Sequence, residues 1–161
     1  MDSFVIVTKS GKRDVYEEIL PQIESLIRDE TDLVANLANT ASVLRMAFPD
    51  RISWVGFYLA RANELVLGPF QGKPACVRVQ LGRGVCGTAA LSRKTVIVPN
   101  VDEFPGHIVC DPDSRSEIVI PMLRGENLLA VLDVDSSSLG SFDETDKEYL
   151  EKIGKLLEKK F

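Results

Sequence analysis

Three cysteines, Cys76, Cys86 and Cys110, are the residues of this sequence best suited to covalent chemistry. Neither interval between them has the C-x-x-C spacing of redox and zinc motifs, and an odd number of cysteines does not make a disulfide framework. Spacing gives no support to a Cys3His zinc site with His107, the single histidine. Because a reduced cysteine often behaves as a small buried hydrophobe, Cys76 within A-C-V-R-V also fits a purely structural role.

Local sequence does not decide which thiol attacks. Cys86 lies at the start of a helix predicted over 85–92, where the helix dipole favours the thiolate by about 0.3–1 kcal/mol. That is less than the roughly 1.4 kcal/mol of one pKa unit. Cys110 is followed by Asp111 and Asp113, whose charges oppose ionisation of the thiol. How close the three thiols lie in the folded chain is therefore the open question.

Three carboxylates form a second candidate group. Asp133 and Asp135 are two residues apart on a predicted strand, so their side chains point to the same face, and Glu117 begins the neighbouring strand of a predicted hairpin. If they converge, they form an electronegative pocket suited to an ammonium group or a metal ion. They would also raise one another's pKa and keep one carboxyl protonated near neutrality as an acid. The alternative is that all three lie exposed at strand ends.

Aromatic residues accompany these acids on another predicted strand, 52–59. Trp54, Phe57 and Tyr58 lie on it, and Trp54 and Tyr58 share one face by parity. Core packing would explain them, and so would an aromatic wall beside the acids that holds a small apolar group.

Residues 82–87, G-R-G-V-C-G, satisfy the G-x-G-x-x-G pattern of dinucleotide-binding loops, and Asp102 follows at a distance that suits a ribose contact. The helix predicted over 85–92 has only about two turns, too few for the crossover helix of that fold. We therefore favour a tight turn into a short helix, with glycines that permit positive φ and close packing.

The chain has 161 residues, a length typical of one domain, so residues 1–161 are interpreted as a single domain. Its net charge of −5 argues against nucleic acid as a partner. No run approaches the roughly 18 apolar residues of a membrane span, and the N-terminus has only an apolar tetrad at 4–7, too short for a signal peptide. We expect a cytoplasmic protein that does not contact membranes and whose thiols are kept reduced.

Hydrophobic periodicity predicts an α+β fold, with helices at both ends and a mostly antiparallel sheet between them. Pro21 is expected to kink or split the first helix, and Ser141 and Glu144 are expected to form a capping box before the last one. The predicted helices span 13–29, 32–47, 85–92 and the residues after 144; the predicted strands span 52–59, 64–70, 75–81, 95–99, 116–122 and 128–134, with a loop at 100–115.

Four stretches carry the most specific pattern: WVGFY at 54–58, LGPFQGKPACVRVQLGRGVCGTA at 67–89, VDEFPGHIVCDPDSRSEIVIP at 101–121 and LLAVLDVDS at 128–136. Together they resemble the free methionine-(R)-sulfoxide reductases, small stand-alone GAF-domain enzymes. The resemblance implies a GAF domain with a mostly antiparallel central sheet and helices packed on one side. It also implies reduction of the R-sulfoxide of free methionine without a cofactor, an activity that protects against oxidative damage.

The resemblance also assigns the thiols. Cys110 would attack the sulfur, releasing methionine and leaving a sulfenic acid, and Cys76 or Cys86 would resolve it as a disulfide. Thioredoxin would then reduce that disulfide by exchange. A homodimer is compatible with the amphipathic terminal helices.

By the same resemblance, Glu117, Asp133 and Asp135 match acids that bind the substrate ammonium and protonate the sulfoxide oxygen. Trp54 and Tyr58 match the aromatic wall around the S-methyl group. Two other functions share part of this pattern. A sensory GAF module would bind a small ligand without needing three cysteines, and a redox-sensing interaction domain would use the thiols but turn over no small molecule.

Overall fold

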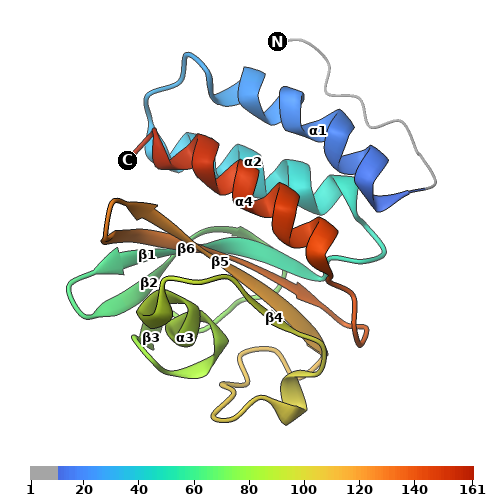
Figure 1. The fold of residues 1–161 in the computed structure, drawn as a ribbon, viewed down its shortest axis with the longest axis vertical. Coiled ribbons are helices and arrows are strands. Elements are labelled where there is room, and N and C mark those ends of the chain that lie inside the picture. The colour runs from blue at the N-terminus through green and yellow to red at the C-terminus, as the bar shows by residue number, and fades with distance from the viewer. Residues whose placement is uncertain (1–10) are drawn as a thin grey trace.

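One antiparallel sheet of six strands organises the chain, as the computed structural model of residues 11–161 shows (Figure 1). The apolar tetrad at 4–7 lies outside the described residues. The spatial order of the strands is β3-β2-β1-β6-β5-β4. The two longest strands, β6 and β5, pair with each other and lie between β1 and β4. The strands are β1 (Trp54–Arg61), β2 (Glu64–Gln71), β3 (Arg78–Gln80), β4 (Val96–Val98), β5 (Ser116–Arg124) and β6 (Asn127–Ser136).

Helices cover both faces of this sheet. The three long helices, α1 (Lys12–Ile27), α2 (Leu33–Ala47) and α4 (Glu144–Glu158), lie on one face, as predicted, and the short α3 (Gly84–Ser92) lies on the other (Figure 1). β3 and β4 are the two edge strands, so the segment that connects them, which contains α3, has to pass across one face of the sheet. The long helices occupy one face, so α3 lies on the other. Within the described residues, no helix is long and apolar enough to cross a membrane.

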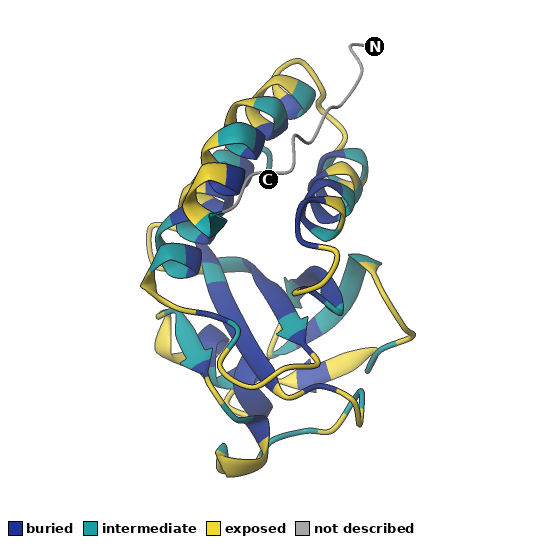
Figure 2. Cartoon of the chain, turned by 90° about the vertical axis from the view of Figure 1, so that its right-hand side faces the viewer, coloured by how far each residue is buried: buried dark blue, intermediate teal, exposed yellow. Residues whose placement is uncertain are grey.

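Strand alternation divides the buried apolar side chains into two clusters. Phe57 on β1 and Leu132 on β6 point toward the long helices, whereas Trp54, Tyr58 and Val131 point toward α3. Figure 2 shows the result: the strands are buried along most of their length, and the helices are buried only on their inner sides. The face under α3 therefore has its own core, separate from the one under the long helices.

Of the predicted kink or split at Pro21, the split is wrong, because α1 is one continuous helix across it. Pro21 is exposed, whereas Ile19, Ile23 and Ile27 on the same helix are buried against the core. Tertiary packing of that apolar stripe outweighs the hydrogen bond that a proline removes.

The predicted capping box at Ser141 and Glu144 is also wrong, and the structure places it two residues later. Asp143 is the N-cap of α4, and the Asp146 carboxylate accepts a hydrogen bond from the Asp143 backbone N–H at 2.8 Å. The Ser141 hydroxyl instead donates to Ser136 Oγ at 2.7 Å. A carboxylate accepts these backbone hydrogen bonds as well as a hydroxyl does, so the sequence contained two equivalent caps.

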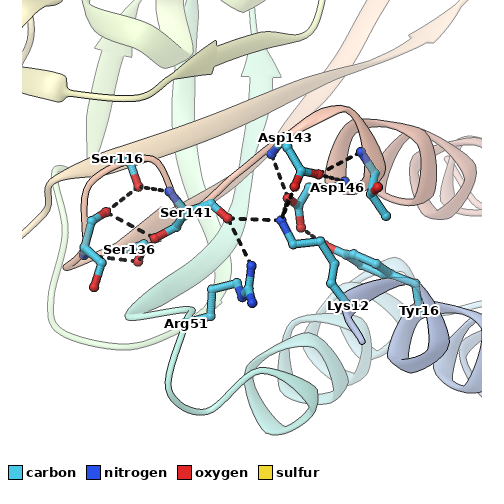
Figure 3. Close-up of polar contacts among 10 residues, drawn as sticks. Lys12, Tyr16, Arg51, Ser116, Ser136, Ser141, Asp143 and Asp146 are labelled. Carbon is cyan, nitrogen blue, oxygen red and sulfur yellow. Dashed lines mark hydrogen bonds and ion pairs between the residues drawn. The ribbon is translucent and has the colours of Figure 1, made fainter. Parts of the chain in front are cut away.

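A buried ion pair joins the two ends of the chain at this cap (Figure 3). Lys12 Nζ donates to Asp143 Oδ2 at 2.9 Å and also to the carboxylate of Asp146, and Tyr16 Oη donates to Asp146 Oδ1 at 2.9 Å. Because Asp146 is almost fully buried, its charge needs these partners, and α1 is thereby fixed to the start of α4.

The glycines of residues 82–87 have the conformations that a tight turn requires, which confirms that interpretation. Gly82 and Gly84 have φ of 82° and 61°, and the Gly82 N–H donates to the Gly87 carbonyl at 2.8 Å. A Cβ atom on Gly87 would lie 2.3 Å from the Gln80 carbonyl oxygen, a backbone atom that cannot easily move. The chain therefore turns on itself between β3 and α3.

Replacing Gly87 by alanine should lower the free energy of unfolding by about 1–3 kcal/mol, because the added methyl group overpacks against backbone. Urea denaturation followed by circular dichroism measures this. The matched control is Gly154→Ala in α4, where a Cβ atom would meet nothing nearer than 3.6 Å. There we expect a gain of about 0.5–1 kcal/mol from helix propensity. Equal effects in the two variants would contradict the proposed clash.

Candidate active site

The strand register brings the predicted acids and aromatic residues together. β6 lies between β1 and β5, and Asp135 is paired with Trp54 on one side and with Glu117 on the other. The next residue of β6 on that face, Asp133, is paired with Gly56 and Val119. Side chains of three neighbouring strands therefore point to the same face and line one pocket on the α3 side of the sheet. The residues that line it include Trp54, Tyr58, Cys86, Cys110, Glu117, Asp133 and Asp135.

Glu117 and Asp133 are buried in this pocket and Asp135 is half-buried, so the alternative placement of all three at exposed strand ends is wrong. Glu117 and Asp133 are each only 6% exposed. Asp135 Oδ1 accepts a hydrogen bond from Ser114 Oγ at 2.9 Å, whereas Asp133 Oδ1 has no hydrogen-bond partner among the described residues. An orphaned buried carboxylate oxygen in a pocket indicates a place for a donor group of a ligand.

Burial raises the pKa of all three carboxyl groups, because a low-dielectric environment disfavours their charged form. It raises the pKa of Asp133 to about 6. The pKa values of Glu117 and Asp135 lie well above their ordinary values, first through burial and then through the charge of Asp133. The cluster therefore keeps protons at neutral pH and can act as an acid.

Trp54 and Tyr58 form a wall on the same side of the sheet, with ring centroids 6.1 Å apart. Trp54 Nε1 donates to the Lys73 carbonyl at 3.0 Å, and Tyr58 Oη donates to the Cys76 carbonyl at 2.9 Å. Both polar atoms are thus satisfied, and the rings present apolar surface to the pocket. Phe57, by contrast, belongs to the core under the long helices.

A disulfide joins Cys76 and Cys110, whose Cα atoms lie 5.5 Å apart. The predicted strand over 75–81 is shorter than expected and begins at Arg78, so Cys76 lies in the connection that precedes it. Cys110 lies on the loop 100–115, where it lines the pocket. The structure therefore pairs two of the three thiols across two loops, at the edge of the acidic pocket.

Cys86 remains a free, buried thiol. Its sulfur lies 3.9 Å from Glu117 Oε1, and burial, together with the charges of Asp133 and Glu117, raises the pKa of the thiol well above its ordinary value. The Cys86 sulfur and one carboxylate oxygen each of Glu117 and Asp133 lie within 4.8 Å of one another, a spacing that also suits a cation. Cys76 and Cys110 are not part of that group.

The pocket is also lined by polar residues that sequence reasoning did not place in the site, among them Arg83, His107 and Ser114. His107 Nε2 lies 4.0 Å from Glu117 Oε2, and burial lowers the pKa of the imidazole, which favours its neutral form. Their only signals in the sequence were the glycine-rich motif around Arg83 and the polar loop that carries the other two residues.

Several known proteins are similar to this chain in sequence and in fold. Residues 22–160 match the family model of the GAF domain. A free methionine-R-sulfoxide reductase of Neisseria meningitidis, solved in complex with its substrate, superposes with a TM-score of 0.96 and 52% identity, over 100% of this chain and 96% of that one. The free methionine-R-sulfoxide reductase of Saccharomyces cerevisiae is 44% identical over 92% of this chain and 87% of its own length.

The enzyme of the same name from Escherichia coli is 43% identical, over 92% of this chain and 90% of its own length. These relatives cover nearly the whole chain, and the α+β GAF fold predicted from the sequence is confirmed. The chain therefore belongs to the GAF domain family and, within it, to the free methionine-R-sulfoxide reductases.

Proposed function

We propose that this protein reduces free methionine-R-sulfoxide to methionine, with Cys110 as the attacking thiol. The observation that carries the proposal is the disulfide between Cys76 and Cys110 at the edge of a pocket that holds buried acids and an aromatic wall. A sensory module would need no such pair of thiols. A redox-sensing interaction domain would leave the buried acids and the orphaned oxygen of Asp133 without a purpose.

The reaction balances with these groups alone and one external reductant. The Cys110 sulfur attacks the sulfoxide sulfur while an acid of the pocket protonates the oxygen, so that a sulfur–sulfur bond forms and the oxygen leaves as water. Water then attacks the Cys110 sulfur, the sulfur–sulfur bond breaks, methionine leaves and Cys110 becomes a sulfenic acid. The Cys76 thiol then displaces that hydroxyl as water, which forms the disulfide. An external dithiol supplies two electrons and two protons, becomes a disulfide itself and restores both thiols.

The pocket's acids and aromatic rings have separate tasks in this proposal. Protonation is needed because an unprotonated sulfoxide oxygen is a poor leaving group, and Glu117 is the acid whose pKa is raised well above its usual range beside both aspartates. The unpartnered Oδ1 of Asp133 is available to the substrate ammonium. Trp54 and Tyr58 hold the S-methyl group against their rings.

Cys76 is the better candidate than Cys86 for the resolving thiol. It is already bonded to Cys110, whereas Cys86 is buried beside Glu117 with a raised pKa and is therefore a poor nucleophile. We assign Cys86 to the pocket wall, where its thiol donates to Glu117.

We propose thioredoxin as the reductant and a reducing compartment such as the cytosol as the location. We also propose that residues 1–161 form one GAF domain. The disulfide is flanked by two exposed apolar residues, Val77 at 60% and Val109 at 64%. An apolar rim around a disulfide suits a protein dithiol that must bury surface as it docks.

Serine variants of the three cysteines separate these roles. Cys110→Ser should lower methionine release by at least about a thousandfold, because the nucleophile is lost. Cys76→Ser should release about one methionine per chain and then stop with thioredoxin as reductant, whereas Cys86→Ser should keep steady turnover. Rapid quench and mass spectrometry of the chain after one turnover measure these outcomes. Continued turnover of Cys76→Ser together with loss in Cys86→Ser would reverse the assignment of the resolving thiol.

The acid cluster predicts the alkaline side of the pH profile. As pH rises, Glu117, whose pKa is raised well above its ordinary value, loses the proton that the sulfoxide oxygen needs, so single-turnover methionine release should slow on the alkaline side. Asp135→Asn removes a charge that raises the pKa of Glu117, so the alkaline limb should move to lower pH by roughly half to one unit. The control is Glu126→Gln in the exposed β5–β6 turn. An alkaline limb unchanged in Asp135→Asn would exclude the cluster as the proton source.

The apolar rim predicts a defect confined to reductant docking. Val77→Asp should raise the KM for thioredoxin about tenfold, since a charge must be desolvated in the contact, and should leave single-turnover methionine release unchanged within about twofold. Val34→Asp on α2, where Val34 is also 60% exposed, is the matched control and should change neither quantity. An unchanged KM in Val77→Asp would place the thioredoxin contact elsewhere.

A further inference from the structure

We propose that Cys86, Glu117 and Asp133 form a binding site for one zinc ion in the acidic pocket, and that zinc bound there inhibits reduction of the sulfoxide. Binding of the metal follows from the placement of these three side chains. The inhibition rests on the proposed function, because two of the three ligands are the acids that supply the proton and accept the substrate ammonium in that reaction.

The three ligand atoms come from three elements that hold them at the spacing of a metal site. Cys86 lies in the first turn of α3, Glu117 on β5 and Asp133 on β6. The Cys86 sulfur and one carboxylate oxygen of each acid all lie within 4.8 Å of one another. Zinc bonds of about 2.3 Å to sulfur and about 2.1 Å to oxygen separate two ligands of a tetrahedral ion by roughly 3.4–3.6 Å. A small inward movement of the side chains therefore brings all three atoms to one ion.

The group is buried and lacks a positive counter-charge. Cys86 is 7% exposed, and Glu117 and Asp133 are each 6% exposed, yet all three line the pocket. Among residues 11–161, no lysine or arginine forms an ion pair with either acid. Asp133 Oδ1 is in addition buried without a hydrogen-bond partner. A divalent cation would supply both the counter-charge that two carboxylates need and a bond for the unpartnered oxygen.

The Cys86 thiol determines which cation fits. The proposed reaction gives this thiol no chemical step, although its sulfur lies 3.9 Å from Glu117 Oε1. An ammonium group gains little from a thiol, and Mg²⁺ and Ca²⁺ prefer sites made of oxygen alone. Zinc, by contrast, binds thiolate sulfur together with carboxylate oxygen, and the thiol proton leaves to solvent as the metal enters. His107 Nε2, 4.0 Å from Glu117 Oε2, adds a nitrogen donor beside the site.

Zinc at this site would stop the reaction and leave the redox pair unchanged. Its bond to Glu117 takes the place of the proton that the sulfoxide oxygen needs, and its bond to Asp133 occupies an acceptor of the substrate ammonium. Cys76 and Cys110 are not part of the ligand group, so the attacking and resolving thiols keep their chemistry. Removing the metal with a chelator should therefore restore activity without any reductant.

The first test measures zinc binding to the oxidised chain, in which the disulfide between Cys76 and Cys110 leaves Cys86 as the single free thiol. Titration calorimetry with zinc chloride should give one zinc per chain with a Kd of about 1 μM or lower. Cys86→Ala and Asp133→Asn should each weaken binding at least about a hundredfold, because each removes a ligand.

The matched control is Asp113→Asn, which removes an exposed carboxylate from the loop 100–115 and should bind zinc as wild type does. Co²⁺ in place of zinc identifies the sulfur ligand, because a cobalt–thiolate bond gives a charge-transfer band in the near ultraviolet. That band should appear in the oxidised wild type and be absent from Cys86→Ala. Mg²⁺ and Ca²⁺ should bind at least about a hundredfold more weakly than zinc. Unchanged zinc affinity in Cys86→Ala, or magnesium binding as tight as that of zinc, would overturn the site.

The second test asks whether bound zinc inhibits. Single-turnover methionine release is measured with and without saturating zinc in the same reduced variant, so that each variant is its own reference. Wild type should slow at least about tenfold and recover when a chelator is added, whereas Cys86→Ala should slow by less than about twofold. Equal inhibition of the two would overturn this site as the place where zinc acts.

The two tests also separate this inference from the proposed function. If zinc-free wild type does not reduce the sulfoxide, the proposed function is overturned, and zinc binding to the oxidised chain is still measured independently of turnover. If wild type reduces the sulfoxide and binds no zinc, the zinc site is overturned and the proposed function stands.

Discussion

Removal of three carboxyl groups from water, two of them buried and one half-buried, on one face of the sheet is the constraint on which the site depends. Glu117, Asp133 and Asp135 are brought together by the register of β5 and β6, and no described cation of the protein neutralises them there. Desolvation then leaves two remedies, protons or the positive group of a ligand. Both are useful to a sulfoxide reductase, because the leaving oxygen needs the proton and the amino acid brings the ammonium. The desolvation that disfavours the charged carboxylates therefore also favours protonated acids and a bound ammonium group, which the reaction needs.

The sheet topology places the desolvated carboxyl groups on the α3 side, away from the core under the long helices. On the opposite face the long helices bury apolar side chains, and a buried carboxylate there, Asp146, is held by Lys12 and Tyr16 (Figure 3). On the α3 side the helix is short and its residues are small, such as Ala89 and Ala90, so it covers the sheet closely beside the pocket. One face of the sheet thus supplies most of the apolar packing, which allows the other to carry poorly satisfied polar groups.

Sequence alone predicted what depends on strand parity. Asp133 with Asp135, and Trp54 with Tyr58, each share a face because side chains alternate, and a predicted hairpin was enough to bring Glu117 beside them. The pairing of Cys76 with Cys110 depends on how two irregular loops meet, and no periodicity encodes that. Arg83 and Ser114 were missed for the same reason. The cap of α4 was misplaced because Asp143 and Ser141 are both acceptable N-caps, and only the contact with Lys12 distinguishes them.

The arrangement of the pocket also accounts for discrimination between sulfoxide epimers in the proposed reaction. The substrate sulfur carries an oxygen, a methyl group and the amino-acid chain, and two parts of the pocket suit the first two: Glu117, and the rings of Trp54 and Tyr58. Cys110 lines the same pocket from the loop 100–115. Exchanging the oxygen and the methyl group, as the other epimer requires, would set the oxygen against the apolar rings and the methyl group against the acids. The proton could then not reach the leaving oxygen, so selection of one epimer follows from the same separation of acids and aromatic rings that the strand register imposes.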